Sequence, residues 1–202
     1  MVVATRLPVP YRDAGLIEEA AEVFRYRYAG EVLPVDPLWL SEAMLDLLLI
    51  PVAQLRDCGG PEALLSSDLR HLFLDQQSLT DDSLANRLRF SVSHELAHLF
   101  LHADTLREQT WRDESEWRET FMRIPTKEYQ RVEVQANLFA SYLLVPSGPL
   151  REAFQVQWEI ASSNPRNTSR EACGLAVSRT GRQFAVSTEV VVRRLLQEGL
   201  LP

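Results

Sequence analysis

The feature that most constrains this chain is the pentapeptide His-Glu-Leu-Ala-His at residues 94–98. It lies in an apolar stretch whose pattern predicts a helix. In a helix, His94 and His98 lie one turn apart on the same face, where two imidazoles can bind one zinc ion. Glu95 lies beside them, placed to take a proton from water. A catalytic zinc uses three protein ligands. The fold must therefore bring a third ligand to this helix from elsewhere in the chain.

His102 is one further turn along, but it does not suit the geometry of a third ligand. At a rise of 1.5 Å per residue it lies about 12 Å along the axis from His94. Zinc bonds of about 2 Å cannot bridge that distance unless the helix breaks. We therefore interpret His102 as a residue that supports the site from behind or lies on the surface, and direct ligation requires a break in the helix.

A second predicted helix, 132–145, contains the better candidate, Glu133. Its neighbours are mostly apolar or small, and a carboxylate buried among them costs free energy unless it is paired with a cation or binds a metal. Asn137 lies one turn further on the same face, where it can orient a ligand. From these residues alone, an alternative stays open. Glu133 can instead be a surface residue or an ion-pair partner of Arg131 or Arg87.

The sequence does not identify the group that would stabilise a developing oxyanion. Arg87, Arg89 and His102 are candidates, although a structural salt bridge is the commoner use of each arginine. Tyr142 lies nine residues after Glu133, and a regular helix places it on the opposite side.

Composition limits the function classes. The 202 residues carry a net charge of −7, which argues against a non-specific binder of nucleic acid or anionic membranes. Charged residues and prolines interrupt the first 15 residues, so we expect no signal peptide, and no apolar stretch is long enough to span a bilayer. Cys58 and Cys173 lack metal-binding spacing and are interpreted as reduced thiols. We expect a cytoplasmic protein without a membrane partner and without direct DNA binding.

The remaining patterns predict an α+β fold with a small antiparallel or mixed sheet. We expect helices at 16–28 and 38–48, strands at 50–55, 63–66 and 72–75, and a long helix from about 80 to 102. Asp36 and Pro37 suit the start of the second helix, and Asp81 and Asp82 suit the start of the long one. We expect the strand 72–75 at a sheet edge, where an extended substrate can pair with it.

The C-terminal part is expected to differ from the rest. Residues 103–130 are strongly charged and form either a solvated segment or a flap beside the site. A linker is expected at 159–169, and Ser187 suits the cap of a final helix. These features divide the chain into a metal-binding domain at 1–147 and a helical region at 148–202, in which two helices resemble part of a helix-turn-helix.

Two motifs together resemble the ImmA/IrrE family of zinc metallopeptidases. The first is Arg89-Phe-Ser-Val-Ser-His-Glu-Leu-Ala-His98 followed by Leu101-His102, and the second is Glu133-x-x-Ala136-Asn137-x-Phe139-Ala140-x-x-Leu143-Leu144-x-Pro146. The similarity covers about residues 15–147, and the tail from Phe184 to Leu195 resembles the family's usual ending. The chain departs from the family at Gln135, where an acidic residue is common, and in the length of the 103–130 segment.

The resemblance implies a gluzincin-like fold in which His94, His98 and Glu133 hold Zn²⁺ and Glu95 is the catalytic base. It also implies an endopeptidase that cleaves a helix-turn-helix transcriptional repressor and so relieves repression of a mobile element or a stress response. Such an enzyme would be selective, and acidic residues of the charged segment would suit docking of a basic partner: Glu114, Glu116 and Glu119.

Two other functions remain as alternatives. The first is a non-proteolytic module that uses the zinc-stabilised fold to bind a partner protein. The presence of Glu95 favours the enzyme, since a binder does not need this base. The second is a DNA-binding regulator acting through its C-terminal helices, because that region is locally basic, with Arg166, Arg170, Arg179, Arg182, Arg193 and Arg194. The overall acidity argues against it.

Overall fold

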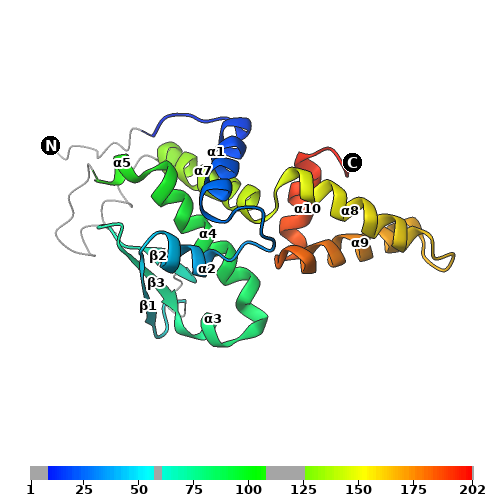
Figure 1. Ribbon diagram of the computed structural model, residues 1–202, viewed down its shortest axis with the longest axis horizontal. Coiled ribbons are helices and arrows are strands. Elements are labelled where there is room, and N and C mark those ends of the chain that lie inside the picture. The colour runs from blue at the N-terminus through cyan, green and yellow to red at the C-terminus, as the bar shows by residue number, and fades with distance from the viewer. Residues whose placement is uncertain (1–8, 57–60, 108–125, 202) are drawn as a thin grey trace.

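The long helix α4 (Ala85–Leu101) lies between two layers in the computed structural model. A small sheet packs on one side of α4, and helices α7 (Thr126–Leu144) and α1 (Ala14–Tyr28) follow on the other side (Figure 1). The predicted α+β fold with a small mixed sheet is confirmed. The structure describes residues 9–56, 61–107 and 126–201.

An apolar core holds α4, α7 and α1 together. Leu96 of α4 and Phe139 of α7 are fully buried. The ring of Phe139 meets the ring of Phe24 of α1 edge to face, with their centroids 5.5 Å apart, and Phe100 packs against both. Such aromatic pairs stabilise packing beyond the area they bury. This core determines how α4 and α7, the two helices that carry the predicted ligands, face one another.

The sheet has three short strands, β1 (Leu48–Val52), β2 (Ala63–Leu65) and β3 (His71–Asp75), in the order β1-β3-β2. β1 runs parallel to β3, and β2 runs antiparallel to it. The expectation that the strand 72–75 forms a sheet edge is wrong, because β3 pairs on both sides and is the central strand. The edge strand that packs against α4 is β2.

The second helix starts where expected and ends earlier. Asp36 accepts hydrogen bonds from the first backbone N–H groups of α2 (Pro37–Trp39), and Pro37 occupies the first turn. A π-helical turn, Leu40–Met44, follows. The helix then stops, because Asp46 has a left-handed backbone with φ of 55°. The predicted end at residue 48 is wrong, since β1 begins there.

The helix that carries the histidines begins later than predicted. The short helix α3 (Gln76–Thr80) and a 3-10 turn, Asp82–Leu84, come before Ala85. Asp81 therefore caps the 3-10 turn, where it accepts a hydrogen bond of 2.9 Å from the N–H of Ser83. The predicted end near His102 agrees with the structure, in which α4 ends at Leu101.

Most of the charged segment lies outside the described residues. α5 (Ala103–Arg107) is its first part. Residues 108–125 are not among those described, and they include the proposed docking glutamates Glu114, Glu116 and Glu119. The flap and the docking role therefore stay predictions. Cys58 also lies outside the described residues, and Cys173 is a half-buried free thiol.

Three helices form the C-terminal part and extend away from the sheet (Figure 1): α8 (Ser147–Ser162), α9 (Ser169–Phe184) and α10 (Thr188–Gln197). The linker predicted at 159–169 is shorter, because α8 continues to Ser162. Thr168 and Glu171 then start α9 with a capping box, in which each side chain accepts from the other residue's backbone N–H. Ser187 caps α10, as predicted.

Arg194 joins α10 to the rest of the molecule. It is fully buried, and its guanidinium lies 4.1 Å from the centre of the Tyr142 ring. It donates a 3.1 Å hydrogen bond to the carbonyl of Val145 and pairs with Glu198 at 2.9 Å. The division at residue 147 stays a prediction, although α8 does begin there. Within the described residues, no helix is both long and apolar enough to cross a membrane.

Candidate metal centre

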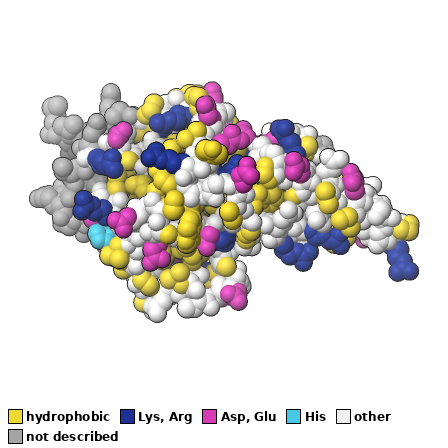
Figure 2. Space-filling model, in the orientation of Figure 1, with side chains coloured by type: hydrophobic (Ala, Val, Ile, Leu, Met, Phe, Trp, Pro, Cys, Tyr) yellow, Lys and Arg dark blue, Asp and Glu magenta, His cyan; other side chains and the backbone are white. Residues whose placement is uncertain are grey.

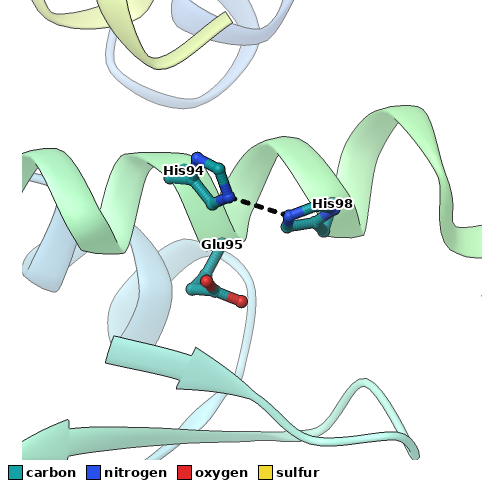
Figure 3. A group of neighbouring side chains, drawn as sticks. All are labelled: His94, Glu95 and His98. Carbon is teal, nitrogen blue, oxygen red and sulfur yellow. Dashed lines mark hydrogen bonds between the residues drawn. The ribbon is translucent and has the colours of Figure 1, made fainter. Parts of the chain in front are cut away.

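His94 and His98 lie side by side on α4, as their spacing predicts (Figure 3). Their Nε2 atoms are 3.0 Å apart. Both rings are largely buried, with exposed side-chain fractions of 15% and 13%. The two nitrogens therefore point towards one position beside the helix.

Glu133 reaches the same position from α7. One carboxylate oxygen lies 3.3 Å from Nε2 of His94, and the other lies 3.7 Å from Nε2 of His98. Two atoms bound about 2.0 Å from zinc at a tetrahedral angle lie about 3.3 Å apart. The spacing and chemistry of these three side chains thus fit a zinc ion with one position left for water.

The alternative partners of Glu133 are engaged elsewhere. Arg87 pairs with Glu62 at 2.5 Å, and Arg131 donates a hydrogen bond to the carbonyl of Val9. The ion pairs that the sequence left open for Glu133 are therefore absent among the described residues, and the carboxylate instead faces the two imidazoles.

Glu95 is directed away from the two rings, towards the sheet (Figure 3). Its carboxylate accepts a 2.9 Å hydrogen bond from the backbone N–H of Leu65 in β2. Burial raises the pKa of Glu95 to about 7, and the charge of His94 and the Leu65 hydrogen bond oppose the rise. A carboxylate with this pKa can exchange protons with water near neutral pH.

Two carboxylates thus compete for the role of third ligand. His94, Glu95 and His98 have ligand atoms within 4.8 Å of one another. Glu133 lies close to both Nε2 atoms, at 3.3 and 3.7 Å, whereas the Leu65 N–H holds Glu95 towards the sheet. The geometry therefore favours Glu133 as the ligand and leaves Glu95 beside the site.

Asn137 and His102 support the two imidazoles from behind. Asn137 Oδ1 lies 3.3 Å from Nδ1 of His94, and His102 Nδ1 lies 3.2 Å from Nδ1 of His98. His102 is only 1% exposed, so it is not a surface residue. Burial lowers its pKa to about 4 and keeps it neutral. α4 is continuous past His98, so the helix break that ligation by His102 would require does not occur.

The pKa values of the two facing imidazoles shift in opposite directions, although burial alone would lower both. Burial disfavours the charged form of His94, but the hydrogen bond and charges of Glu133 and the charge of Glu95 outweigh this effect and raise its pKa. Burial, which is the largest cause, and the neighbouring His94 lower the pKa of His98 well below its ordinary value. His98 is therefore a neutral imidazole, the form that binds metals.

The three oxyanion candidates from the sequence have other partners. Arg87 pairs with Glu62, Arg89 donates to the backbone carbonyls of Val35 and Ala185, and His102 lies behind His98. Tyr142 packs against Arg194, away from Glu133, as predicted.

Sequence reasoning missed Tyr129. It lies on α7 one turn before Glu133, hence on the same face. Burial raises the pKa of its phenol, and the charges of Glu133 and Glu95 raise it further, so the hydroxyl keeps its proton. The spacing of four residues from Glu133 is the signal that points to it.

Comparison with known families agrees with this geometry. The model of the IrrE N-terminal-like domain, a peptidase family, matches residues 79–196, more than half of the chain. The chain belongs to the ImmA/IrrE family. In this ImmA/IrrE family member the matched range contains both histidines, both glutamates and nearly all of the three C-terminal helices. No curated protein matches the chain.

Proposed function

We propose that the protein is a zinc-dependent endopeptidase. The observation that carries the proposal is the meeting of three side chains, in which the Nε2 atoms of His94 and His98 lie 3.0 Å apart and each faces a carboxylate oxygen of Glu133 at 3.3 or 3.7 Å. A second carboxylate, that of Glu95, lies beside them. Membership of a peptidase family supports the same reaction class.

A zinc ion held by these residues would activate a water molecule and polarise the scissile carbonyl. Glu95 then accepts a proton from the attacking water and delivers it to the leaving amine nitrogen. The hydrogen bond from Leu65 holds the Glu95 carboxylate at the side of the site that faces β2. Burial of Glu95 raises its pKa in the zinc-free protein, and the same burial favours uptake of a proton by its carboxylate.

The edge of β2 that faces away from β3 pairs with no strand among the described residues, and we propose it as the place for the substrate chain. The backbone N–H of Ser66 and the carbonyl of Glu62 bond to β3, so the alternate residues Ala63 and Leu65 direct their backbone groups away from β3. Leu65 is the residue that holds Glu95. We propose that an extended peptide pairs with this edge, which would bring its scissile bond next to the site.

We assign stabilisation of the developing oxyanion to Tyr129. Its hydroxyl keeps a proton near neutral pH, and its position one turn before Glu133 on α7 puts it on the helix face that carries this carboxylate. A protonated phenol can donate a hydrogen bond to a developing negative charge. Tyr129→Phe is expected to lower kcat while leaving zinc content unchanged.

We propose that the substrate is a helix-turn-helix transcriptional repressor, as the family resemblance implies. The alternative of direct DNA binding has less support. Figure 2 shows several Lys and Arg side chains along one edge of the C-terminal helices. Of the arginines that make this region basic, Arg194 is fully buried and pairs with Glu198, so it is not available to a phosphate.

The proposal is tested with the zinc-loaded protein and, as the substrate, a helix-turn-helix repressor encoded by a neighbouring gene, if the genome carries one there. We expect the wild type to cut the repressor at one site and to leave casein uncut. Glu95→Gln retains zinc but cannot accept the proton, so it should leave the repressor intact. Cutting by Glu95→Gln at the wild-type rate would contradict the mechanism, and comparable rates on casein would contradict the selectivity. Binding of the repressor without cutting would support the non-proteolytic alternative.

A further inference from the structure

A line of hydrogen-bonding groups leads from His98 to the N-terminal segment. Nδ1 of His98 lies 3.2 Å from Nδ1 of His102, and Nε2 of His102 lies 3.0 Å from Oε1 of Gln135. Gln135 in turn donates from Nε2 to the carbonyl oxygen of Pro10 at 3.0 Å. His102 and Gln135 are 1% and 2% exposed, so water does not offer them alternative partners.

The carbonyl of Pro10 determines the direction of every bond in this line. A carbonyl oxygen only accepts hydrogen bonds, so Gln135 turns its NH₂ group to Pro10 and its oxygen to His102. That oxygen also only accepts, and the hydrogen of neutral His102 therefore lies on Nε2, leaving a lone pair on Nδ1. His98 must then donate from Nδ1, which leaves the lone pair of its Nε2 facing the metal position.

We infer that Gln135 is a positioning residue that, acting through His102, holds His98 in the tautomer that binds the metal. The inference rests on the proposed function, since it concerns the same metal site. It gives a role to the residue at which this chain departs from the acidic residue common in the family.

His94 is oriented in the same manner by a shorter route. The NH₂ group of Asn137 donates to the backbone carbonyl of Glu133 at 2.8 Å, so its oxygen faces Nδ1 of His94. Each metal-facing imidazole is thus oriented by an amide side chain of α7, which a backbone carbonyl orients in turn. Gln135 does not contact His98 directly, and His102 lies between the two side chains and bonds to both.

The test compares zinc affinity, measured by chelator competition at about pH 8, where free histidine is neutral. Gln135→Met removes the acceptor and should weaken zinc binding about 10- to 100-fold, the usual effect of losing a group that orients a ligand. Gln135→Glu keeps an acceptor towards His102 and should retain most of the affinity. Gln130→Met is the matched control, because Gln130 lies exposed on the same helix, and it should bind zinc like the wild type.

The relative zinc affinities of these two variants distinguish a positioning role of Gln135 from a packing role. If Gln135 only filled space, methionine would be tolerated at this buried position and a buried glutamate would not. Zinc affinity in Gln135→Met equal to or above that of Gln135→Glu would therefore overturn the inference. Failure of the wild type to bind zinc would instead overturn the proposed function.

A second measurement tests the inference on the wild type, so it does not require that a variant folds. Long-range ¹H–¹⁵N spectra of the zinc-loaded wild type distinguish the tautomers of the imidazoles, and the chain has only four histidines to assign. We expect the hydrogen of His102 on Nε2. A hydrogen on Nδ1 of His102 would overturn the inference, because His98 would then have no acceptor for its own Nδ1 hydrogen.

Discussion

Two glutamates with the same chemistry have different surroundings in this site. Glu133 stands between two imidazoles with 29% of its side chain exposed. Glu95 is held in a buried position by a backbone N–H of β2. These environments suit the two glutamates to the different tasks that we propose, metal ligation for Glu133 and proton exchange for Glu95.

At the residue scale, the ligand assignment predicts the zinc content of a variant. Glu133→Ala removes one of three protein ligands and should lower bound zinc from about one ion per chain to near zero at low free zinc. Glu152→Ala, which changes an exposed glutamate of α8, is the control and should retain full zinc. Metal analysis after gel filtration checks this, and equal zinc in both variants would remove Glu133 from the ligand set.

The surroundings of Glu95 also predict how stability depends on pH. Burial raises its pKa in the folded protein to about 7, above the value in an unfolded chain, so folding favours the protonated acid. The zinc-free protein should be most stable below the unfolded pKa and lose stability as pH rises towards and through about 7, by roughly 2 to 3 kcal/mol for this group. Glu95→Gln keeps an acceptor for Leu65 without a charge and should lose this part of the pH dependence.

Urea unfolding of the zinc-free wild type and of zinc-free Glu95→Gln, at about pH 5 and about pH 8, measures how much the free energy of unfolding of each protein changes with pH. Subtracting the two curves removes the contributions that both proteins share and leaves that of Glu95 together with the part of the His94 pKa shift that the Glu95 charge causes. The same loss of stability in both proteins would contradict the raised pKa.

At the scale of elements, the pairing of α4 with α7 brings Glu133 to the histidines. Phe139 lies in the aromatic cluster between these helices and α1. Because all contacts of the cluster are apolar, they stabilise the helix pair through buried area and close packing. The precision of the site therefore depends on residues that never touch a metal.

Truncating an aromatic side chain of this cluster should lower the stability of the protein. Phe139→Ala leaves a cavity and is expected to lower the free energy of unfolding by about 3 to 5 kcal/mol. Val134→Ala is a matched control on the same helix, because Val134 is 56% exposed, and its effect should stay within about 0.5 kcal/mol. Denaturant unfolding of zinc-free samples checks both values. An effect of Phe139→Ala as small as that of Val134→Ala would contradict the role of the cluster.

At the scale of the whole molecule, one buried arginine fastens the C-terminal helix to the end of α7. Arg194 stacks on Tyr142 and bonds to the carbonyl of Val145, while its partner Glu198 also bonds to Arg151 and Ser147. Removing Arg194 leaves the buried carboxylate of Glu198 with only one arginine partner, Arg151, and leaves the carbonyl of Val145 without its side-chain donor.

Arg194→Met is therefore expected to destabilise the protein by about 2 to 3 kcal/mol, because the largely buried carboxylate of Glu198 loses one of its two arginine partners. Arg193→Met changes the exposed neighbour on the same helix and should have little effect. Thermal unfolding of the two variants, measured side by side, tests this. Equal midpoints would show that Arg194 does not fasten α10 to the molecule.

The sequence by itself predicted the features that depend on neighbours along the chain. The shared face of His94 and His98 follows from a spacing of four residues, and the caps at Asp36 and Ser187 bond to N–H groups within three residues. Local interactions of this kind are set by residue order alone. The same spacing of four residues puts Glu133 and Asn137 on one face of their helix, while zinc binding itself stays a prediction.

Only the tertiary structure decided which distant groups meet. Whether Glu133 faces imidazoles or Arg87 depends on how α7 packs against α4, and no local pattern specifies that contact. β3 is the central strand because β1 pairs with one of its edges and β2 pairs with the other. Gln135 reaches Pro10 across 125 residues. Such contacts arise because the core brings remote segments together, and the free energy that selects them comes from burial and packing over the whole chain.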